Sequence, residues 1–220
     1  HSFPTRRSSD LAIIAVVGCY SQIAPKEVSA IEGVDVVLGT RNKGDVVYYV
    51  NKARDEQTAQ IYVESVLRNK KFEALNIEEY QDKTRAFLKI QDGCNRFCAY
   101  CIIPYSRGSV CSKEPRQVLD EINKLSEHGF KEIILSGIHT ASYGLDLDSE
   151  ITLVDLLEEI EKLDGIERVR IGSIEPAFFT PEVIEKIRNM KKLCPQFHLS
   201  LQSGCNATLK RMNRRYTAEE

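Results

Sequence analysis

The sequence has no apolar run that approaches the roughly 20 residues of a membrane-spanning helix. Its first ten residues, HSFPTRRSSD, are polar and lack the layout of a signal peptide. It also lacks a large net charge, and the value of −2 argues against a protein that binds nucleic acid through its overall charge. We therefore expect a globular, cytoplasmic protein with no membrane partner.

Charge is nevertheless uneven along the chain. Between Lys186 and Arg215 there are eight Lys or Arg residues and no Asp or Glu. That stretch could face the phosphates of a nucleic acid, or it could form the solvated surface of a basic helix. The residues alone leave both interpretations open.

Cysteine occurs in an odd number, seven, which in a reducing compartment favours metal binding or catalysis over disulfides. Three of the seven, Cys94, Cys98 and Cys101, lie within eight positions. The others are scattered, and each taken alone is expected to be an inert buried thiol: Cys19, Cys111, Cys194 and Cys205.

The first part of the chain is typical of a small α/β domain. Residues 1–11 fit nothing that follows, and we expect them to be disordered or non-native. Over residues 12–55, apolar runs and helical patterns alternate. Residues 56–84 are polar and weakly patterned, as in an interdomain linker. The expected elements are strand 11–19, helix 25–31, strand 34–39 and helix 43–54.

From residue 85 to 220 the pattern predicts four successive βα units, and therefore parallel strands joined by crossovers. Each strand is followed by a polar or glycine-containing loop. In β/α barrels the chemistry lies at the carboxyl ends of the strands, so we expect the functional residues there. The expected strands are 86–91, 132–137, 168–176 and 197–204, and the helices are 114–129, 151–165, 180–192 and one that begins at 207.

The spacing of the three clustered cysteines points to a metal site with one open position. A structural zinc site usually takes four ligands in two separated pairs. Three thiolates can instead bind three irons of a cubane [4Fe–4S] cluster and leave the fourth iron open. Zinc with Cys111 as the fourth ligand, in a zinc-stabilised RNA-binding module, is the alternative.

The cysteine spacing, with Tyr100 just before Cys101, resembles the cluster motif of the radical S-adenosylmethionine (SAM) superfamily. More specifically, four blocks resemble the tRNA methylthiotransferases: RAFLKIQDGCNRFCAYCIIPYSRG, EIILSGIHTASYG, RIGSIEP and FHLSLQSGCNATLKRMNRRYT. VVGCYSQIAPKEV resembles a cysteine block of that family's N-terminal domain. FLKIQDGCN with GIHTASYG is most similar to the threonylcarbamoyladenosine (MtaB-like) branch.

The resemblance implies an α/β fold: a partial radical SAM barrel with four of six βα units, preceded by the end of a small α/β N-terminal domain. It implies two [4Fe–4S] clusters, one held by Cys94, Cys98 and Cys101 and an auxiliary one with Cys19 as a ligand. Arg107 could balance the negative charge of the cluster or pair with a surface acid, and His139 and His198 are expected to be ordinary hydrogen-bonding histidines. SAM contacts are implied for Tyr100, Ser136, Gly137, Ser173, Glu175, Gln202 and Ser203.

The implied reaction is radical methylthiolation of C2 of N6-threonylcarbamoyladenosine at position 37 of tRNA. Isopentenyladenosine in tRNA and a ribosomal-protein aspartate are the alternative substrates in the same family. The implied partners are the tRNA anticodon loop and an electron donor protein. Because two βα units and two auxiliary-cluster cysteines are missing, we expect the isolated chain to be inactive. The candidate RNA contacts are Lys210, Arg211, Arg214 and Arg215.

Overall fold

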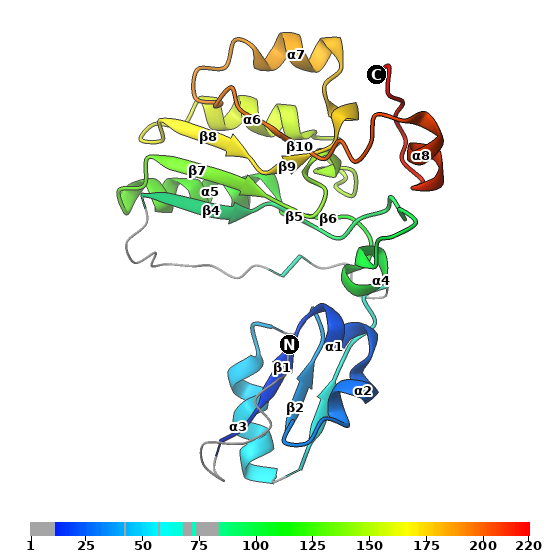
Figure 1. The fold of residues 1–220 in the computed structure, drawn as a ribbon. Coiled ribbons are helices and arrows are strands. Elements are labelled where there is room, and N and C mark those ends of the chain that lie inside the picture. The colour runs from blue at the N-terminus through cyan, green and yellow to red at the C-terminus, as the bar shows by residue number, and fades with distance from the viewer. Residues whose placement is uncertain (1–11, 42, 57, 68–71, 74–83) are drawn as a thin grey trace. The chain divides into compact units, whose positions relative to one another are not determined.

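A computed structural model describes residues 12–41, 43–56, 58–67, 72–73 and 84–220 (Figure 1). The chain forms two compact units. The first contains the described residues up to 73 together with Ile102–Gly108. The second contains residues 84–101 and 109–220.

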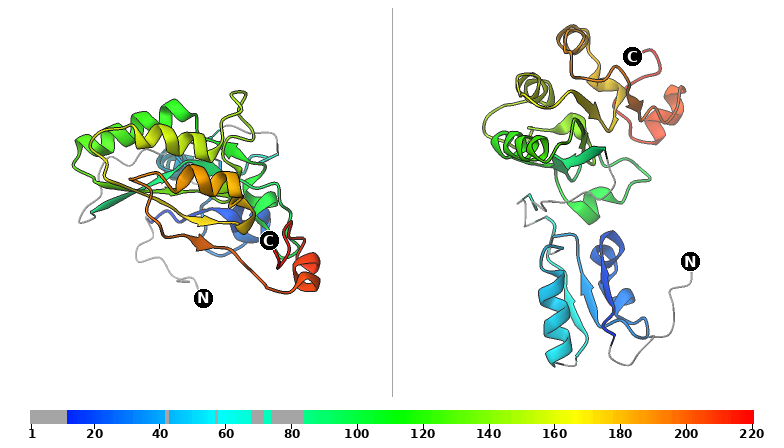
Figure 2. Two further views of the ribbon diagram at one scale, coloured as in Figure 1. Left: turned by 90° about the horizontal axis from the view of Figure 1, so that it is seen from above. Right: turned by 90° about the vertical axis from the view of Figure 1, so that its left-hand side faces the viewer.

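The first unit is a three-stranded parallel sheet in the order β1 (Ala15–Val17), β2 (Val36–Leu38), β3 (Gln60–Tyr62). Helix α3 (Val46–Glu56) covers one face, and α1 (Cys19–Ile23) and α2 (Pro25–Ser29) cover the other (Figure 2). The middle strand is fully buried, which explains its uninterrupted apolar sequence. The short helix α4 (Ile103–Arg107) also packs in this unit, where Thr40 Oγ1 donates a hydrogen bond to the Ser106 carbonyl (2.7 Å).

Strand β3 lies inside the segment predicted as a linker, so that prediction is wrong for residues 60–62. The strand is held by its backbone pairing with β2 and leaves Ile61 48% exposed. An edge strand of this kind needs no apolar run, and this explains why the sequence pattern missed it. Residues 57, 68–71 and 74–83 of the predicted linker, and the predicted disordered residues 1–11, lie outside the described residues.

The second unit contains the parallel sheet β4 (Arg85–Lys89), β7 (Glu132–Ser136), β8 (Arg168–Ile171). Helices α5 (Pro115–Glu127), α6 (Leu153–Glu161) and α7 (Pro181–Ile187) lie on the same side of the strands (Figure 2). The core fills the space between them. Val118 and Ile122 of α5 and Leu156 of α6 are fully buried against Ile133 and Leu135 of β7. The predicted alternation of parallel strands and helices is confirmed.

The strands do not form one continuous barrel wall over the described residues. The predicted third strand is divided at Gly172 into β8 and β9 (Ser173–Ile174), and the Gly172 N–H donates to the Leu135 carbonyl (2.8 Å). The predicted fourth strand is regular only over β10 (His198–Leu199), which pairs in parallel with β9. Helix α8 (Asn206–Arg211) follows it.

Short elements complete the second unit. Strands β5 (Gln91–Asp92) and β6 (Cys111–Ser112) form an antiparallel pair, and two 3₁₀ turns cover Thr140–Ser142 and Pro176–Phe178. Among the described residues, every helix is too short or too polar to pass through a lipid bilayer.

Candidate metal centre

The three clustered cysteines lie in the loop that follows β5, which we call the cysteine loop (residues 93–101). Strand β4 leads into β5, so the loop begins near the carboxyl end of the first strand of the second unit, as predicted. The Gly93 N–H donates to Asp92 Oδ1 (2.8 Å), and the Val110 N–H donates to Asn95 Oδ1 (3.2 Å). Both contacts hold the loop against the β5–β6 pair.

Cys94 is buried, and Cys98 and Cys101 are half-buried. Burial raises the pKa of the Cys94 thiol, and the charges of Cys98 and Cys101 raise it further, while a hydrogen bond from the Arg96 N–H to Cys94 Sγ (3.4 Å) opposes the rise. The charges of both other cysteines therefore act on the Cys94 thiol. A bound metal centre would stabilise the thiolate forms of the three residues.

Three cysteine thiols in one loop are a donor set that suits a cubane cluster, because each thiolate binds a different iron. Over the part of the chain that the structure describes, no group of three His, Cys, Asp or Glu side chains is placed to hold a single metal ion. Cys111, the fourth ligand of the zinc alternative, is buried in β6 opposite Asp92, and the geometry gives that alternative no support.

A buried carboxylate forms the centre of a charged network beside the cysteine loop. Glu175, just beyond β9, is only 3% exposed. Its Oε2 lies 3.0 Å from an Arg96 terminal nitrogen and 2.9 Å from His139 Nε2, and its Oε1 lies 3.4 Å from Arg214 Nη1. Burial opposes ionisation, but the hydrogen bond from His139 and the charge of Arg96 outweigh it and lower the pKa of Glu175.

Tyr100 joins the cysteine loop to this network. Its hydroxyl donates to Gln202 Oε1 (3.0 Å) and accepts from Arg214 Nη2 (2.5 Å), whose guanidinium lies 5.8 Å from the Tyr100 ring centroid. The predicted role of Arg214 as an RNA contact needs correction. Its side chain is 10% exposed and paired with Glu175, so it belongs to the interior of the site.

The other predicted residues lie near the carboxyl ends of the strands but have local partners. Ser136 Oγ donates to the Leu88 carbonyl (3.3 Å). Gly137 lies so close to Gln91 that a Cβ there would be 2.8 Å from Gln91 Oε1. Ser173 Oγ lies 2.9 Å from His198 Nδ1, and Ser203 Oγ accepts from the Cys205 N–H (3.1 Å).

Sequence reasoning missed Arg96 and Gln91. Gln91 is fully buried, donates to the Asp92 and Gly93 carbonyls (2.6 and 2.8 Å) and accepts from the His139 N–H (2.8 Å). A glutamine at the end of an apolar strand was the available signal for a buried polar residue. Of the basic residues, Lys210, Arg211 and Arg215 are exposed.

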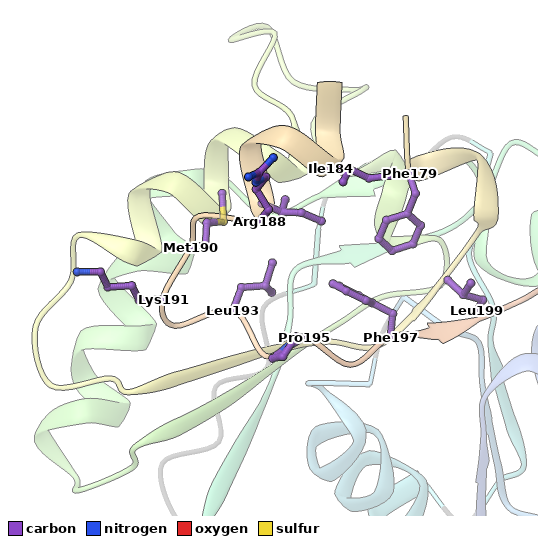
Figure 3. A pocket seen from close by; sticks show the side chains of 10 residues that line it. Phe179, Ile184, Arg188, Met190, Lys191, Leu193, Pro195, Phe197 and Leu199 are labelled. Carbon is purple, nitrogen blue, oxygen red and sulfur yellow. The ribbon is translucent and has the colours of Figure 1, made fainter. Parts of the chain in front are cut away.

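Two cavities flank the second unit. One of about 260 Å³ is lined by Arg96 and Glu175 together with apolar residues such as Phe178 and Val183. The other, of about 700 Å³, lies between α7 and the segment that leads to β10, and its wall is mainly apolar (Figure 3). The larger cavity contains none of the predicted site residues, whereas Glu175 lines the smaller one.

Cys19 belongs to the first unit. It is the first residue of α1, directly after Gly18, whose φ of 129° suits glycine. Arg107 Nε, from α4 of the same unit, donates to Cys19 Sγ (3.3 Å). Because Cys19 is the one cysteine in the first 93 residues of the sequence, these residues cannot by themselves complete a three-cysteine cluster site.

Residues 88–220 match the family model described as the radical SAM superfamily, and this match covers the cysteine loop and the whole charged network. The chain belongs to the radical SAM superfamily. Membership implies a [4Fe–4S] cluster and SAM as cofactors, and the three thiols of the cysteine loop are the residues that fit the cluster.

Among curated relatives, the chain is similar to the threonylcarbamoyladenosine tRNA methylthiotransferase MtaB of Bacillus subtilis, with 41% identity over 214 residues, 97% of this chain and 47% of the relative. It is 35% identical to MtaB of Aquifex aeolicus over 218 residues, 99% of this chain and 53% of the relative. It is 40% identical to the tRNA-2-methylthio-N(6)-dimethylallyladenosine synthase of Clostridium botulinum over 215 residues, 94% and 46% of the two chains. The chain is a radical SAM methylthiotransferase homologue that spans about half the length of the curated relatives it matches.

Among solved structures, the apo form of the cobalamin-dependent SAM radical enzyme OxsB superimposes with a TM-score of 0.57. The two sequences are 14% identical, and the match covers 94% of this chain and 38% of that one. At this identity the likeness concerns the fold alone.

Proposed function

We propose that the chain carries the SAM-cleaving part of a methylthiotransferase that acts on C2 of N6-threonylcarbamoyladenosine at position 37 of tRNA. The observation that carries the proposal is the cysteine loop itself: three thiols within eight residues, beside a buried charged network. The 41% identity to Bacillus subtilis MtaB supports the choice of substrate.

The residues of the second unit divide into two roles. Cys94, Cys98 and Cys101 hold the cluster, and Tyr100, Glu175 and Gln202 orient the nucleoside and amino-acid parts of SAM. A cluster held by these three thiols would supply one-electron reduction of SAM. Such a cofactor is required because no side-chain acid or base removes the hydrogen of an adenine C2 at neutral pH.

The remaining assignments concern the rest of the reaction. Cys19, held by Arg107, is one ligand of an auxiliary cluster. The exposed Lys210, Arg211 and Arg215 contact phosphates of the anticodon loop, which presents its bases unstacked as single-stranded RNA. An electron donor protein completes the partners, and a tRNA substrate is consistent with a cytoplasmic location.

Dimethylallyladenosine in tRNA is the second candidate substrate. It is favoured by the 40% identity to the Clostridium botulinum synthase, which is almost the same as the identity to MtaB. Mass spectrometry of tRNA nucleosides from a strain that lacks the gene separates the two. Our proposal requires the 2-methylthio form of threonylcarbamoyladenosine to disappear. Loss of the dimethylallyl derivative instead would select the second candidate.

Anaerobic reconstitution of the 220-residue chain tests the cluster site directly. We expect a brown protein that contains iron and sulfide and shows a cluster EPR signal after reduction. Cys98→Ala should abolish this signal. Cys205→Ala is the matched control, because Cys205 is an exposed thiol outside the cysteine loop and its loss should change nothing. A colourless protein with stoichiometric zinc, or equal loading of both variants, would refute the assignment.

A further inference from the structure

Three consecutive residues after helix α8 form hydrogen bonds with the cysteine loop. The Met212 carbonyl accepts from the Ala99 N–H (3.1 Å). Asn213 Nδ2 donates to the Phe97 carbonyl (2.9 Å) and, more weakly, to the Arg96 carbonyl (3.4 Å). Arg214 Nη2 donates to the Tyr100 hydroxyl (2.5 Å). The loop is therefore held along most of the interval between Cys94 and Cys101 by residues more than 100 positions away in sequence.

The backbone at this contact adopts an uncommon conformation on both sides. Asn213 has a φ of 57° and Phe97 a φ of 49°. Asparagine tolerates this left-handed region, whereas phenylalanine adopts it at a cost. The Asn213 hydrogen bond to the Phe97 carbonyl is a direct means of stabilising this backbone conformation. Phe97 directly precedes Cys98, and its backbone angles therefore decide where the Cys98 thiol points.

The three residues are themselves well anchored. Leu209 of α8 is buried, and its carbonyl accepts from the Arg214 N–H (2.9 Å). Tyr216 is also buried, and its hydroxyl donates to the Leu201 carbonyl (2.6 Å). Arg214 is paired with Glu175 beyond β9, and its Nε lies buried without a hydrogen-bond partner among the described residues. The segment is thus fixed to the second unit independently of the cysteine loop.

We propose that Met212–Arg214 form a clamp that fixes the cysteine loop in its cluster-binding conformation, with Asn213 as the positioning residue. The inference rests on the proposed cluster site and goes beyond it, because it assigns the geometry of that site to residues that bind no iron. Asn213 acts through the backbone of Arg96 and Phe97, and so through the orientation of Cys98.

The test replaces the Asn213 amide while keeping the backbone conformation accessible. Asn213→Asp removes the donor at constant size, and Asn213→Gly removes the side chain from a position with positive φ. Asn206→Asp is the matched control: Asn206 is the first residue of the preceding helix α8. Its Nδ2 donates to Glu219 Oε2 (2.9 Å) and its Oδ1 accepts from the Ala218 N–H (2.7 Å), and neither atom contacts the cysteine loop. Circular dichroism confirms that each variant is folded.

Two readouts are measured on each variant. Hydrogen exchange of the Ala99 amide in the apo chain should be about fivefold faster in the Asn213 variants, the factor expected for one lost hydrogen bond of ordinary strength. After anaerobic reconstitution, the EPR line shape of the reduced cluster and its change on SAM addition should differ from those of the wild type. The Asn206 variant should match the wild type in both measurements.

The outcomes separate this inference from the proposed function. If the wild type binds no cluster, the proposed function fails, and the Ala99 exchange rate still decides whether the clamp exists. If the wild type binds a cluster while the Asn213 and Asn206 variants share one exchange rate and one EPR signature, the clamp is refuted. If Asn213→Asp does not fold, the same comparison with Asn213→Gly decides the matter.

Discussion

Replacing Glu175 with glutamine should destabilise the second unit more than any exposed charge substitution. The carboxylate is 3% exposed and is the acidic partner of Arg96, His139 and Arg214. Glutamine keeps the shape and one acceptor oxygen but removes the charge. Two guanidinium groups are then left close together without the acid that pairs them. Breaking one partner of a buried ion pair costs about 3–5 kcal/mol, and the retained acceptor places Glu175→Gln near about 3 kcal/mol.

Thermal denaturation of the apo chain, followed by circular dichroism, measures this effect. A loss of about 3 kcal/mol corresponds to a fall of about 6–12 °C in the midpoint for a chain of this size. Glu185→Gln is the control, because its partner Arg188 is exposed and such pairs contribute about 0–1 kcal/mol. Equal midpoints for the two variants would show that the network around Glu175 contributes nothing to stability, and the reasoning would be wrong.

The same carboxylate gives a pH dependence of known sign. The pKa of Glu175 is lower in the folded chain than its ordinary value of 4.5, so the folded state binds the proton less readily than the unfolded state. The stabilisation is therefore fully present above about pH 4.5 and is lost as the pH falls through the lowered value. The difference in stability between wild type and Glu175→Gln should be constant near neutral pH and should shrink in acid. A difference that grows in acid would contradict the assignment.

Two further substitutions test the framework around the site. Gly144→Ala should lower the free energy of unfolding by more than about 3 kcal/mol, because φ is 88° and the new Cβ would lie 1.6 Å from the Ile151 carbonyl oxygen. Gly129→Ala is the control: Gly129 has the same φ but no atom within 4 Å of the new Cβ, so the loss should be about 1 kcal/mol. Equal urea midpoints for the two variants would contradict this prediction. Thr152→Ala should lower the free energy of unfolding by about 1 kcal/mol, because it removes the capping box that Thr152 forms with Asp155 at the start of α6. An unchanged midpoint in urea denaturation would show that the cap does not contribute to stability.

Much of the fold could be predicted because its determinants are local. Thr180 caps α7 and Pro181 is its first residue, so the helix begins where the predicted helix 180–192 begins. The apolar spacing of Val118, Ile122 and Leu125 defined the buried face of α5. Strand β3 and the two-residue strand β6 were not predicted, because a strand this short depends on its pairing partner and not on its own sequence.

The site residues also divide into those that the sequence predicted and those that it did not. The three thiols lie in one short loop, so their spacing in the sequence was sufficient to predict the metal site. The residues of the charged network are far apart in sequence: Arg96 and Arg214 are separated by 118 positions and meet only in the folded chain. Arg214 looked like part of a basic surface stretch, because its sequence neighbours Arg211 and Arg215 are exposed. The amino-acid composition of a basic stretch does not indicate which of its arginines is buried in the fold.

A single carboxylate explains how these distant segments come to share one site. Arg96 belongs to the cysteine loop, His139 follows β7, and Arg214 follows α8. Without an acid between them, the two guanidinium groups would repel each other, because charge is poorly screened in a buried environment. Glu175 pairs with both guanidinium groups and with His139, and these contacts join the three segments. Because two guanidinium groups share one carboxylate, the site keeps an excess of positive charge next to the three thiols. Burying such an excess is unfavourable unless an anionic group lies beside it, and thiolates bound to a cluster provide that group.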